Sequence, residues 1–463
     1  MSKVLHVTEY QSIRCGESFS ASERTVTAAQ FLKLERFNEQ YEQRHKVKVF
    51  QYGARNTLIA QNFVGVIHMG AYQVEVLPKI DADEYRVRQN LLQMVATTLN
   101  LKLHGKALGL LERANQSILE VLIRLYCDLL WEAVHKGMVR RYESRQDNLV
   151  VLRGRLNVSQ QLRHNLARPD RLHCTFDEFT QDNALNQALK AALRILFKLA
   201  RTESSSRSIA ELLFCFDEVT KTPADAINWE RVKTDRLSER YAPLVRMARL
   251  FIEGATPDLT SGSGDGFAVL FDMNQLFEEY VGRQVQRIAA ERGMVAKLQG
   301  PRRYLASREG GAACFELRPD IVVLENGQQS MVIDTKWKRL KASVAKEGIS
   351  TSDLYQMFAY AKQYQVGSVI LLYPHHVDLG EWKSCRNSYR FSEPGTNSSL
   401  HTLFVASLPL VDLKLVPMYL GSIFDSSTHH QTNTGEIVST AWPGPVGAAQ
   451  AVKGTQLNTY LAR

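Results

Sequence analysis

Short runs of apolar residues, separated by polar ones, occupy the first hundred positions of the chain. The runs at 46–54, 57–69 and 71–80 are rich in Val, Ile, Tyr and Phe, with Gly70 at a tight connection. Such runs are typical of β-strands. A polar stretch that favours a helix, AAQFLKLERFNEQYEQRH, precedes them. The pattern predicts a β-rich amino-terminal domain over residues 1–95.

The next part of the chain has the spacing of helices. Residues 185–201 repeat apolar positions every three or four residues, and residues 147–158 interrupt the helices with what looks like a pair of strands. The same spacing places a second group on one helix face: Ile118, Leu122, Leu125 and Leu129. We therefore predict a mainly helical middle region over residues 96–255.

Two segments have the composition of linkers or tails. GATPDLTSGSGDG (254–266) is dense in Gly, Ser, Pro and Asp and separates two strongly patterned regions, which is typical of a linker. The segment 426–463 is rich in Ser, Thr, Gly and Ala, with few large apolar residues, and we expect a poorly packed tail there. A third domain is therefore expected between them, over residues 256–425.

Within this third domain, two apolar runs flank Asn326-Gly327. Asn-Gly between residues that favour strands is a strong signal for a β-hairpin. The flanking patterns predict a helix at 271–293, a helix at 350–364 and a strand at 368–374. The order in this region is helix, strand pair, helix, strand, and the expected fold class is a multi-domain α/β protein.

The predicted hairpin carries two aspartates and a lysine in or beside its apolar strands. Asp320 is at the head of the first strand, Asp334 lies in the second after an apolar run, and Lys336 follows two residues later on the same face. Two carboxylates on adjacent strands can hold Mg²⁺ against a phosphodiester, and a lysine can orient water or neutralise charge. The competing interpretation is a simple ion pair of Asp and Lys at a strand end.

The register of the hairpin decides whether the two aspartates meet. With a simple two-residue loop, Asp320 would lie opposite Ile333, and Asp334 would point to the other face of the sheet. The chemistry therefore needs a loop of odd length or a β-bulge. Pro319 cannot donate a hydrogen bond to a neighbouring strand, so we expect the break beside it.

The flanking helices offer further candidates. Glu278 and Glu279 lie in the second turn of the first helix, where one of them can reach the metal; the alternative is a solvated acidic pair. Gln356 and Tyr360 lie four residues apart on one face of the second helix.

Charge and composition limit the class of protein. The 463 residues carry a net charge of +9, with 44% hydrophobic and 23% charged residues, values that suit a globular protein of two to four domains and a nucleic-acid partner. No apolar run is long enough to span a bilayer, and the amino-terminal residues lack the apolar core of a signal peptide. We expect a cytoplasmic protein that does not bind membranes. The six cysteines contain no C-x-x-C pair, which argues against zinc and disulfides.

These motifs together resemble the PD-(D/E)xK nuclease superfamily and, more narrowly, the McrC family of McrBC modification-dependent restriction systems. The matching pieces are LFEEYV, LRPDIVV, VIDTKWK, SDLYQMFAYA and LLYP, in that order. Upstream, GVIHMGAYQVEVLPKI, LRGRLN and FTQDNALNQALK resemble the amino-terminal and middle parts of the family. The resemblance covers roughly residues 45–375 and leaves the tail after about 425 without a counterpart.

The resemblance implies a restriction-endonuclease-like α/β/α fold for the carboxy-terminal domain, and a role for each candidate residue. Asp320 and Asp334 would be the metal ligands and Lys336 the catalytic lysine. Gln356 would be the supporting residue of the helix that follows, and Glu278, which aligns better than Glu279, the acid of the preceding helix.

The resemblance also implies partners. McrC docks on McrB, a ring-forming AAA+ GTPase, stimulates GTP hydrolysis and supplies the nuclease for anti-phage defence; McrB reads 5-methylcytosine in a separate domain. The chain has no G-x-x-x-x-G-K-[ST] phosphate loop, so GTP would be bound by the partner and not by this chain.

The function that this resemblance predicts is a Mg²⁺-dependent DNA endonuclease subunit acting on double-stranded, modified DNA. Residues 1 to about 255 would dock on the ring and stimulate it. Two alternatives stay open: an activator subunit whose nuclease fold only clamps DNA, and a stand-alone DNA repair nuclease.

Overall fold

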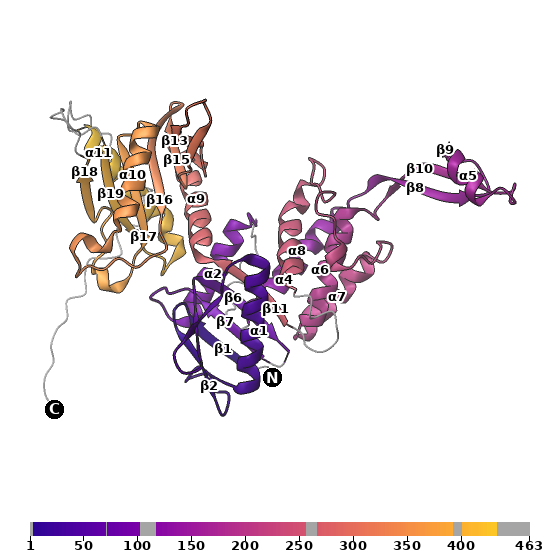
Figure 1. The fold of residues 1–463 in the computed structure, drawn as a ribbon, viewed down its shortest axis with the longest axis horizontal. Helices are drawn as coiled ribbons and strands as arrows, with labels where there is room; N and C mark the ends of the chain where they lie inside the picture. The colour runs from indigo at the N-terminus through magenta and orange to yellow at the C-terminus, as the bar shows by residue number, and fades with distance from the viewer. Residues whose placement is uncertain (1–2, 71, 102–116, 256–265, 392–400, 433–463) are drawn as a thin grey trace, which may run out of the picture.

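The computed structural model describes residues 3–70, 72–101, 117–255, 266–391 and 401–432. Figure 1 shows that the chain forms three parts. An amino-terminal part with two sheets lies in the middle. A helical part with a long projecting arm lies on one side, and a carboxy-terminal part built on a six-stranded sheet lies on the other. The chain is therefore a mixed α/β protein of several parts, as the patterning predicts.

The amino-terminal part has the strands and the helix that the pattern predicts, together with strands that it does not. Helix α1 (Ala28–His45) spans the polar stretch that favours a helix, and Gly70 has a φ of +61°, which suits its turn position. One sheet has the order β1 (Lys3–Thr8), β7 (Tyr72–Leu77), β6 (Phe63–Met69) and β11 (Gly266–Asp272). The other has the order β3 (Thr25–Thr27), β2 (Ser12–Gly16), β5 (Thr57–Ala60) and β4 (Phe50–Gly53).

Strand β11 joins this amino-terminal sheet although it comes late in the chain. It pairs antiparallel with β6, with Val269 opposite Val66. Gly65 permits the approach: its φ is +135°, and a Cβ there would lie 2.1 Å from the carbonyl oxygen of Val269. The range 256–425, expected to form one domain, therefore gives its first strand to the amino-terminal sheet. Most of the expected linker, residues 256–265, lies outside the described residues.

The helical part follows the predicted spacing. Helix α6 (Ala184–Leu199) matches the apolar stretch at 185–201, and helix α4 (Ile118–His135) buries Ile118, Leu122 and Leu125, with Leu129 packed at the edge of the core. The other helices of this part are α7 (Glu203–Cys215) and α8 (Ala242–Gly254), with short 3₁₀ turns η1 (Ala224–Ala226) and η2 (Glu239–Tyr241). Helix α2 (Glu84–Thr98) lies instead beside β7 of the amino-terminal part.

A narrow arm projects from the helical part (Figure 1). Where the sequence predicts a pair of strands at 147–158, the structure has a longer hairpin with a small helix at its tip. Its elements are β8 (Arg141–Leu149), β9 (Arg155–Leu156), α5 (Val158–His164) and β10 (Leu172–Thr180).

The carboxy-terminal part is a mixed sheet between helices. Its strand order is β12 (Val295–Leu298), β15 (Ile321–Glu325), β16 (Gln328–Thr335), β17 (Ser368–Pro374), β19 (Thr402–Leu408) and β18 (Asn387–Arg390). One face packs on α9 (Met273–Glu291) and α11 (Val416–Thr432), and the other packs on α10 (Thr351–Tyr364). The structure therefore has the predicted α/β/α layers here.

Smaller elements complete this part. They are the hairpin β13 (Arg303–Ser307) and β14 (Ala313–Leu317), with the 3₁₀ turns η4 (Ala345–Gly348), η5 (Val377–Leu379) and η6 (Leu413–Leu415).

The expectation of a loose tail from residue 426 is wrong for its first residues. Helix α11 continues to Thr432, and Ser427 is buried, with its carbonyl oxygen accepting a 3.0 Å hydrogen bond from the Ser368 hydroxyl. The rest of the expected tail, residues 433–463, lies outside the described residues.

Candidate active site

A β-bulge sets the register of the β15–β16 hairpin. The turn at Asn326-Gly327 has positive φ at both residues, 51° and 80°, as an Asn-Gly hairpin turn requires. Leu324 then pairs with Gln329 but Val323 pairs with Met331, so Ser330 is the extra residue, and its hydroxyl donates to the Val323 carbonyl at 3.2 Å.

The bulge brings the two aspartates together. Because Ile321 pairs with Ile333, Asp320 comes to lie beside Asp334 on one side of the sheet. The need for a bulge is confirmed, but its expected place beside Pro319 is wrong: the break lies near the turn instead.

Asp320 is held by the residue that follows Asp334. Both the backbone N–H and the hydroxyl of Thr335 donate to Asp320 Oδ2, at 2.7 and 2.8 Å. Burial raises the pKa of Asp320, although these hydrogen bonds and the charge of Lys336 act in the opposite direction. Thr335 therefore orients Asp320, a role that the sequence analysis missed.

Asp334 is almost completely enclosed, with 1% of its surface exposed. Its Oδ2 lies 2.5 Å from Lys336 Nζ, yet this oxygen accepts no hydrogen bond of regular geometry in the described part of the chain. Burial, and then the nearby charge of Asp320, raises the pKa of Asp334 to about 7, in spite of the lysine. An enclosed carboxylate that is paired this poorly is costly unless a further cation joins it.

Lys336 is the cation of the cluster. Burial lowers its pKa, but the charge and close contact of Asp334 and the charge of Asp320 outweigh burial, so the pKa lies above its usual range. The lysine stays protonated at neutral pH. It is therefore suited to neutralise negative charge and not to act as a base.

Gln356 completes a chain of hydrogen bonds from Lys336 into α10. Lys336 Nζ donates to Gln356 Oε1 at 3.1 Å, and Gln356 Nε2 donates to the Tyr360 hydroxyl at 2.9 Å. Tyr360 in turn donates to the carbonyl of Arg318 at 3.1 Å. The spacing of four residues on one helix face thus places both side chains of α10 at the site.

Glu278 lies across a cleft of about 560 Å³ from Asp320. It accepts a hydrogen bond from Gln299 Nε2 at 3.0 Å, and burial followed by the charge of Asp320 raises its pKa. Glu279 instead pairs with Arg283 on its own helix at 3.3 Å. Of the two glutamates, Glu278 is therefore the one whose pKa is raised by the charge of Asp320, although it does not contact the aspartate pair.

The donor set suits a small hard cation. Two carboxylates with a buried, poorly satisfied oxygen are what Mg²⁺ uses in proteins, because it keeps several waters and takes one or two carboxylates. Among the described residues, no group of three or more His, Cys, Asp or Glu side chains could hold a metal ion. A site for a soft or fully protein-ligated metal is therefore not found there.

One further acid near the site was missed. Asp353, in the first turn of α10, is buried and lies 3.4 Å from Lys338 Nζ. Its charge also acts on the pKa values of Asp334 and Lys336. Its position near the amino end of a capped helix, three residues before Gln356, was the available signal.

A family model described as "McrBC 5-methylcytosine restriction system component" matches residues 58–374. The chain belongs to this family. Both the aspartate pair and Gln356 lie within the matched range, while strands β1 to β4 and helix α11 lie outside it. No curated protein matches this McrBC component.

Two solved structures from Thermococcus gammatolerans are similar to this McrBC component. One is the refined half-complex from a tetradecameric assembly of McrB AAA+ hexamers with bound McrC; its matching chain is 19% identical, with a TM-score of 0.64 over 92% of this chain and 100% of that chain. A chain of the cryo-EM structure of the McrBC complex is 22% identical, with a TM-score of 0.47 over 62% of this chain and 88% of that chain. The first likeness supports the fold. No helix in the described ranges is long and apolar enough to cross a membrane.

Proposed function

We propose that this chain is the DNA endonuclease subunit of a McrBC-type restriction complex, with a carboxy-terminal domain of the PD-(D/E)xK type. The observation that carries the proposal is the bulge at Ser330, which places Asp320 and Asp334 side by side next to Lys336. A bulge re-aims side chains at functional sites. A purely structural ion pair would not require two adjoining buried acids.

The residues divide the chemistry between them. Asp320 and Asp334 would hold Mg²⁺, which when bound polarises a phosphodiester and lowers the pKa of a bound water. Thr335 orients Asp320 through two hydrogen bonds. Lys336, kept charged by Asp334 and placed by Gln356, neutralises charge on the phosphate. Glu278 shapes the far wall of the cleft.

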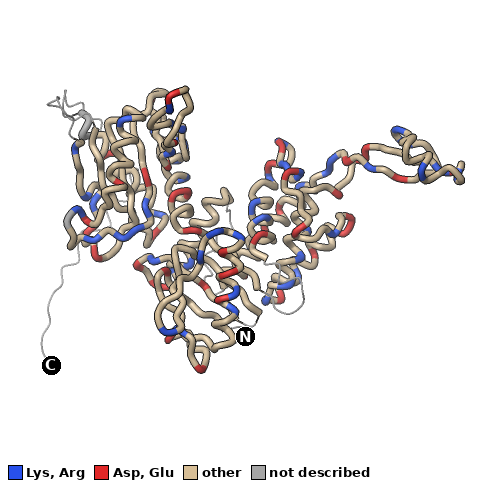
Figure 2. Tube along the Cα trace, in the orientation of Figure 1, with Lys and Arg blue, Asp and Glu red and all other residues tan. Residues whose placement is uncertain are grey.

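The proposed substrate is double-stranded, modified DNA. The net charge of +9 favours such a partner, but Figure 2 shows Lys and Arg interspersed with Asp and Glu over the described residues of all three parts. The proposal for DNA therefore depends on the carboxylate site and on family membership, and not on a basic patch.

We also propose that the chain docks on an AAA+ GTPase ring, which binds GTP in its place. The solved half-complex with bound McrC supports such a partner. The arm offers a surface for it, because its tip exposes apolar side chains that a globular protein would normally cover: Val150, Val151, Leu152, Val158, Leu162 and Leu166.

The experiment compares wild type and Asp334→Ala with and without the ring partner. Modified and unmodified plasmid are incubated with Mg²⁺ and GTP, and GTP hydrolysis is followed in parallel. Asp334→Ala should lower cleavage by roughly 10³-fold or more, because transition-state stabilisation by the metal is lost. It should still stimulate the partner's GTPase, since the arm is unchanged.

A matched variant in the arm separates the two activities. Val151→Asp should fail to stimulate the GTPase while its aspartate pair stays intact. Wild type that stimulates the ring but cuts no plasmid would favour the alternative, an activator that only clamps DNA. Cleavage that needs no partner would favour a stand-alone nuclease.

A further inference from the structure

The four residues after strand β16 point alternately to two different parts of the molecule. Lys336 contacts Gln356, and Lys338 contacts Asp353, with Nζ–oxygen distances of 3.1 and 3.4 Å. Both partners belong to α10. Alternate residues of an extended segment face opposite sides. Trp337, between the two lysines, and Arg339, after them, therefore face away from α10.

Those two residues contact the amino-terminal part. The indole Nε1 of Trp337 donates to both carboxylate oxygens of Glu9, at 3.0 Å each. Arg339 pairs with Asp81 and donates to the Lys79 carbonyl at 3.2 Å. The segment 336–339 is thus shared between the proposed active site and the amino-terminal part.

Glu9 is itself fixed in place. It follows β1, is 3% exposed, and its backbone N–H donates to the Leu77 carbonyl at 3.0 Å. Its Oε2 also accepts from the Lys79 N–H at 3.0 Å. The Glu9 carboxylate accepts the indole with both oxygens and is held by the Lys79 N–H just after β7, which leaves Trp337 little freedom.

The other side of Trp337 packs on the helix that carries Glu278. The indole ring lies 5.3 Å from the ring of Phe277, centroid to centroid, and Trp337 is 3% exposed. Phe277 directly precedes Glu278 in α9. Trp337 therefore lies between Glu9 and α9, and it directly follows Lys336 in the chain.

We propose that Glu9 is a positioning residue of the nuclease site, which holds the Trp337 indole and so fixes the backbone that presents Lys336 to Asp334 and Gln356. This inference rests on the proposed function. It extends the site to a residue that is 328 positions distant from Trp337 in the sequence and belongs to the amino-terminal part. A side chain that supports a reacting group typically accounts for about 10–100-fold in activity, because small misplacements of a reacting group are costly.

The test uses the full chain with its ring partner, GTP and Mg²⁺ in single-turnover cleavage over a range of DNA concentrations. Trp337→Phe removes the indole N–H but keeps a ring against Phe277. It should lower the maximal rate by about 10–100-fold, with the half-saturating DNA concentration and GTPase stimulation unchanged. Glu9→Ala should give the same loss of rate. Glu9→Gln, which keeps one acceptor oxygen, should recover most of it.

Asn90→Ala is the matched control. Asn90 is also a buried polar residue that joins the amino-terminal and carboxy-terminal parts, donating to the Leu410 carbonyl at 2.7 Å, but it does not touch the segment 336–339. It should leave the maximal rate unchanged. A wild-type rate in Trp337→Phe, or an equal loss in Asn90→Ala, would overturn the inference. Wild type that does not cleave with its partner would overturn the proposed function instead.

Discussion

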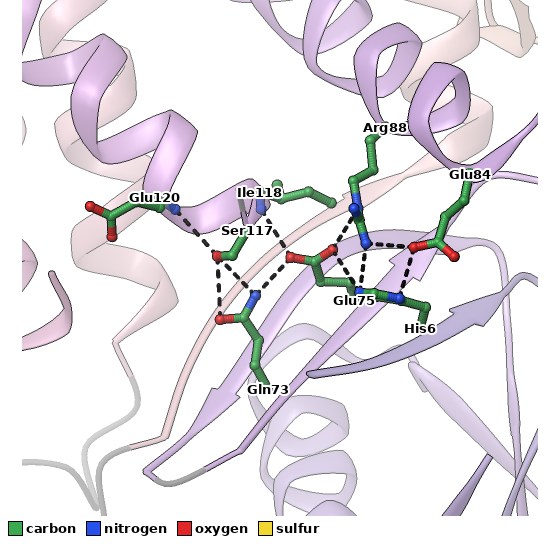
Figure 3. Close-up of polar contacts among 8 residues, drawn as sticks. All are labelled: His6, Gln73, Glu75, Glu84, Arg88, Ser117, Ile118 and Glu120. Atoms are coloured by element: carbon green, nitrogen blue, oxygen red, sulfur yellow. Dashed lines mark hydrogen bonds and ion pairs between the residues drawn. The ribbon is translucent and has the colours of Figure 1, made fainter. Parts of the chain in front are cut away.

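Within the described residues, two buried carboxylates lie in β-strands, and the groups around them differ. Glu75 in β7 and Asp334 in β16 are 0% and 1% exposed. Figure 3 shows Glu75 among donors from three directions: the Ile118 N–H at 2.9 Å, Gln73 Nε2 at 2.8 Å and Arg88 Nε at 2.9 Å. This carboxylate is satisfied by the protein alone.

Asp334 has one close cation, Lys336, and an oxygen that lacks a regular hydrogen bond within the described ranges. Burial of a charge costs free energy wherever it happens. Around Glu75 the fold compensates that cost with its own groups, whereas around Asp334 the compensation is incomplete. The difference indicates a structural role for the first carboxylate and a ligand-binding role for the second.

The largest effect on stability is expected at Glu75. Glu75→Ala removes the acceptor of Arg88 Nε and of the Ile118 N–H in a buried site, so the free energy of unfolding should fall by about 3–5 kcal/mol. Urea denaturation measures this loss. Glu84→Ala is the control, because Glu84 also pairs with Arg88 but its side chain is 51% exposed, and it should cost at most about 1 kcal/mol. Equal losses in the two variants would contradict a special role for the buried carboxylate.

A smaller effect, on activity and not on stability, is expected at Gln356. Gln356→Ala removes the acceptor that places Lys336, and cleavage should fall by about 10–100-fold, less than in the Asp334→Ala protein. Gln363→Ala on the same helix serves as control, because its contact to Arg303 is made by the main-chain oxygen. Cleavage as low as that of Asp334→Ala would show that Gln356 does more than position the lysine.

The smallest effect is a gain in stability when Asp334 is neutralised without metal. Its pKa is about 7 in the folded protein against an ordinary value of 3.8. Between these values the folded chain holds a proton that the unfolded chain releases, so the wild type loses stability as pH rises through this window.

Asp334→Asn has no such group. In EDTA its melting temperature should exceed that of wild type above about pH 7, and the gap should close towards pH 4. A gap that widens on acidification would contradict the assigned pKa shift. The same neutralisation at Glu75 should lower the melting temperature, since its donors are already matched to a carboxylate.

Local pattern predicts much of this molecule. The apolar runs locate β6, β7, β15, β16 and β17, the three- and four-residue spacing locates α4 and α6, and Asn326-Gly327 locates the hairpin turn. The aspartates, Lys336 and Gln356 are recognisable because acids inside an apolar strand and polar residues on one helix face are unusual.

Contacts between distant segments were not predictable in this way. The pairing of β11 with β6 depends on Gly65 and Val269 meeting across the chain, which no local pattern reports. The bulge was inferred from the chemistry, but its place at Ser330 was not. Glu9 carries no local signal at all, because its importance comes from the Trp337 that it holds.

Strand β11 also has a consequence for how the protein is made. The ribosome finishes β6 at Met69 and finishes β11 only at Asp272, about 200 residues later. At about 5–20 residues per second, β6 waits roughly 10–40 s for its neighbour. During that interval one edge of the nascent sheet presents unpaired N–H and C=O groups, which are able to pair with another nascent chain.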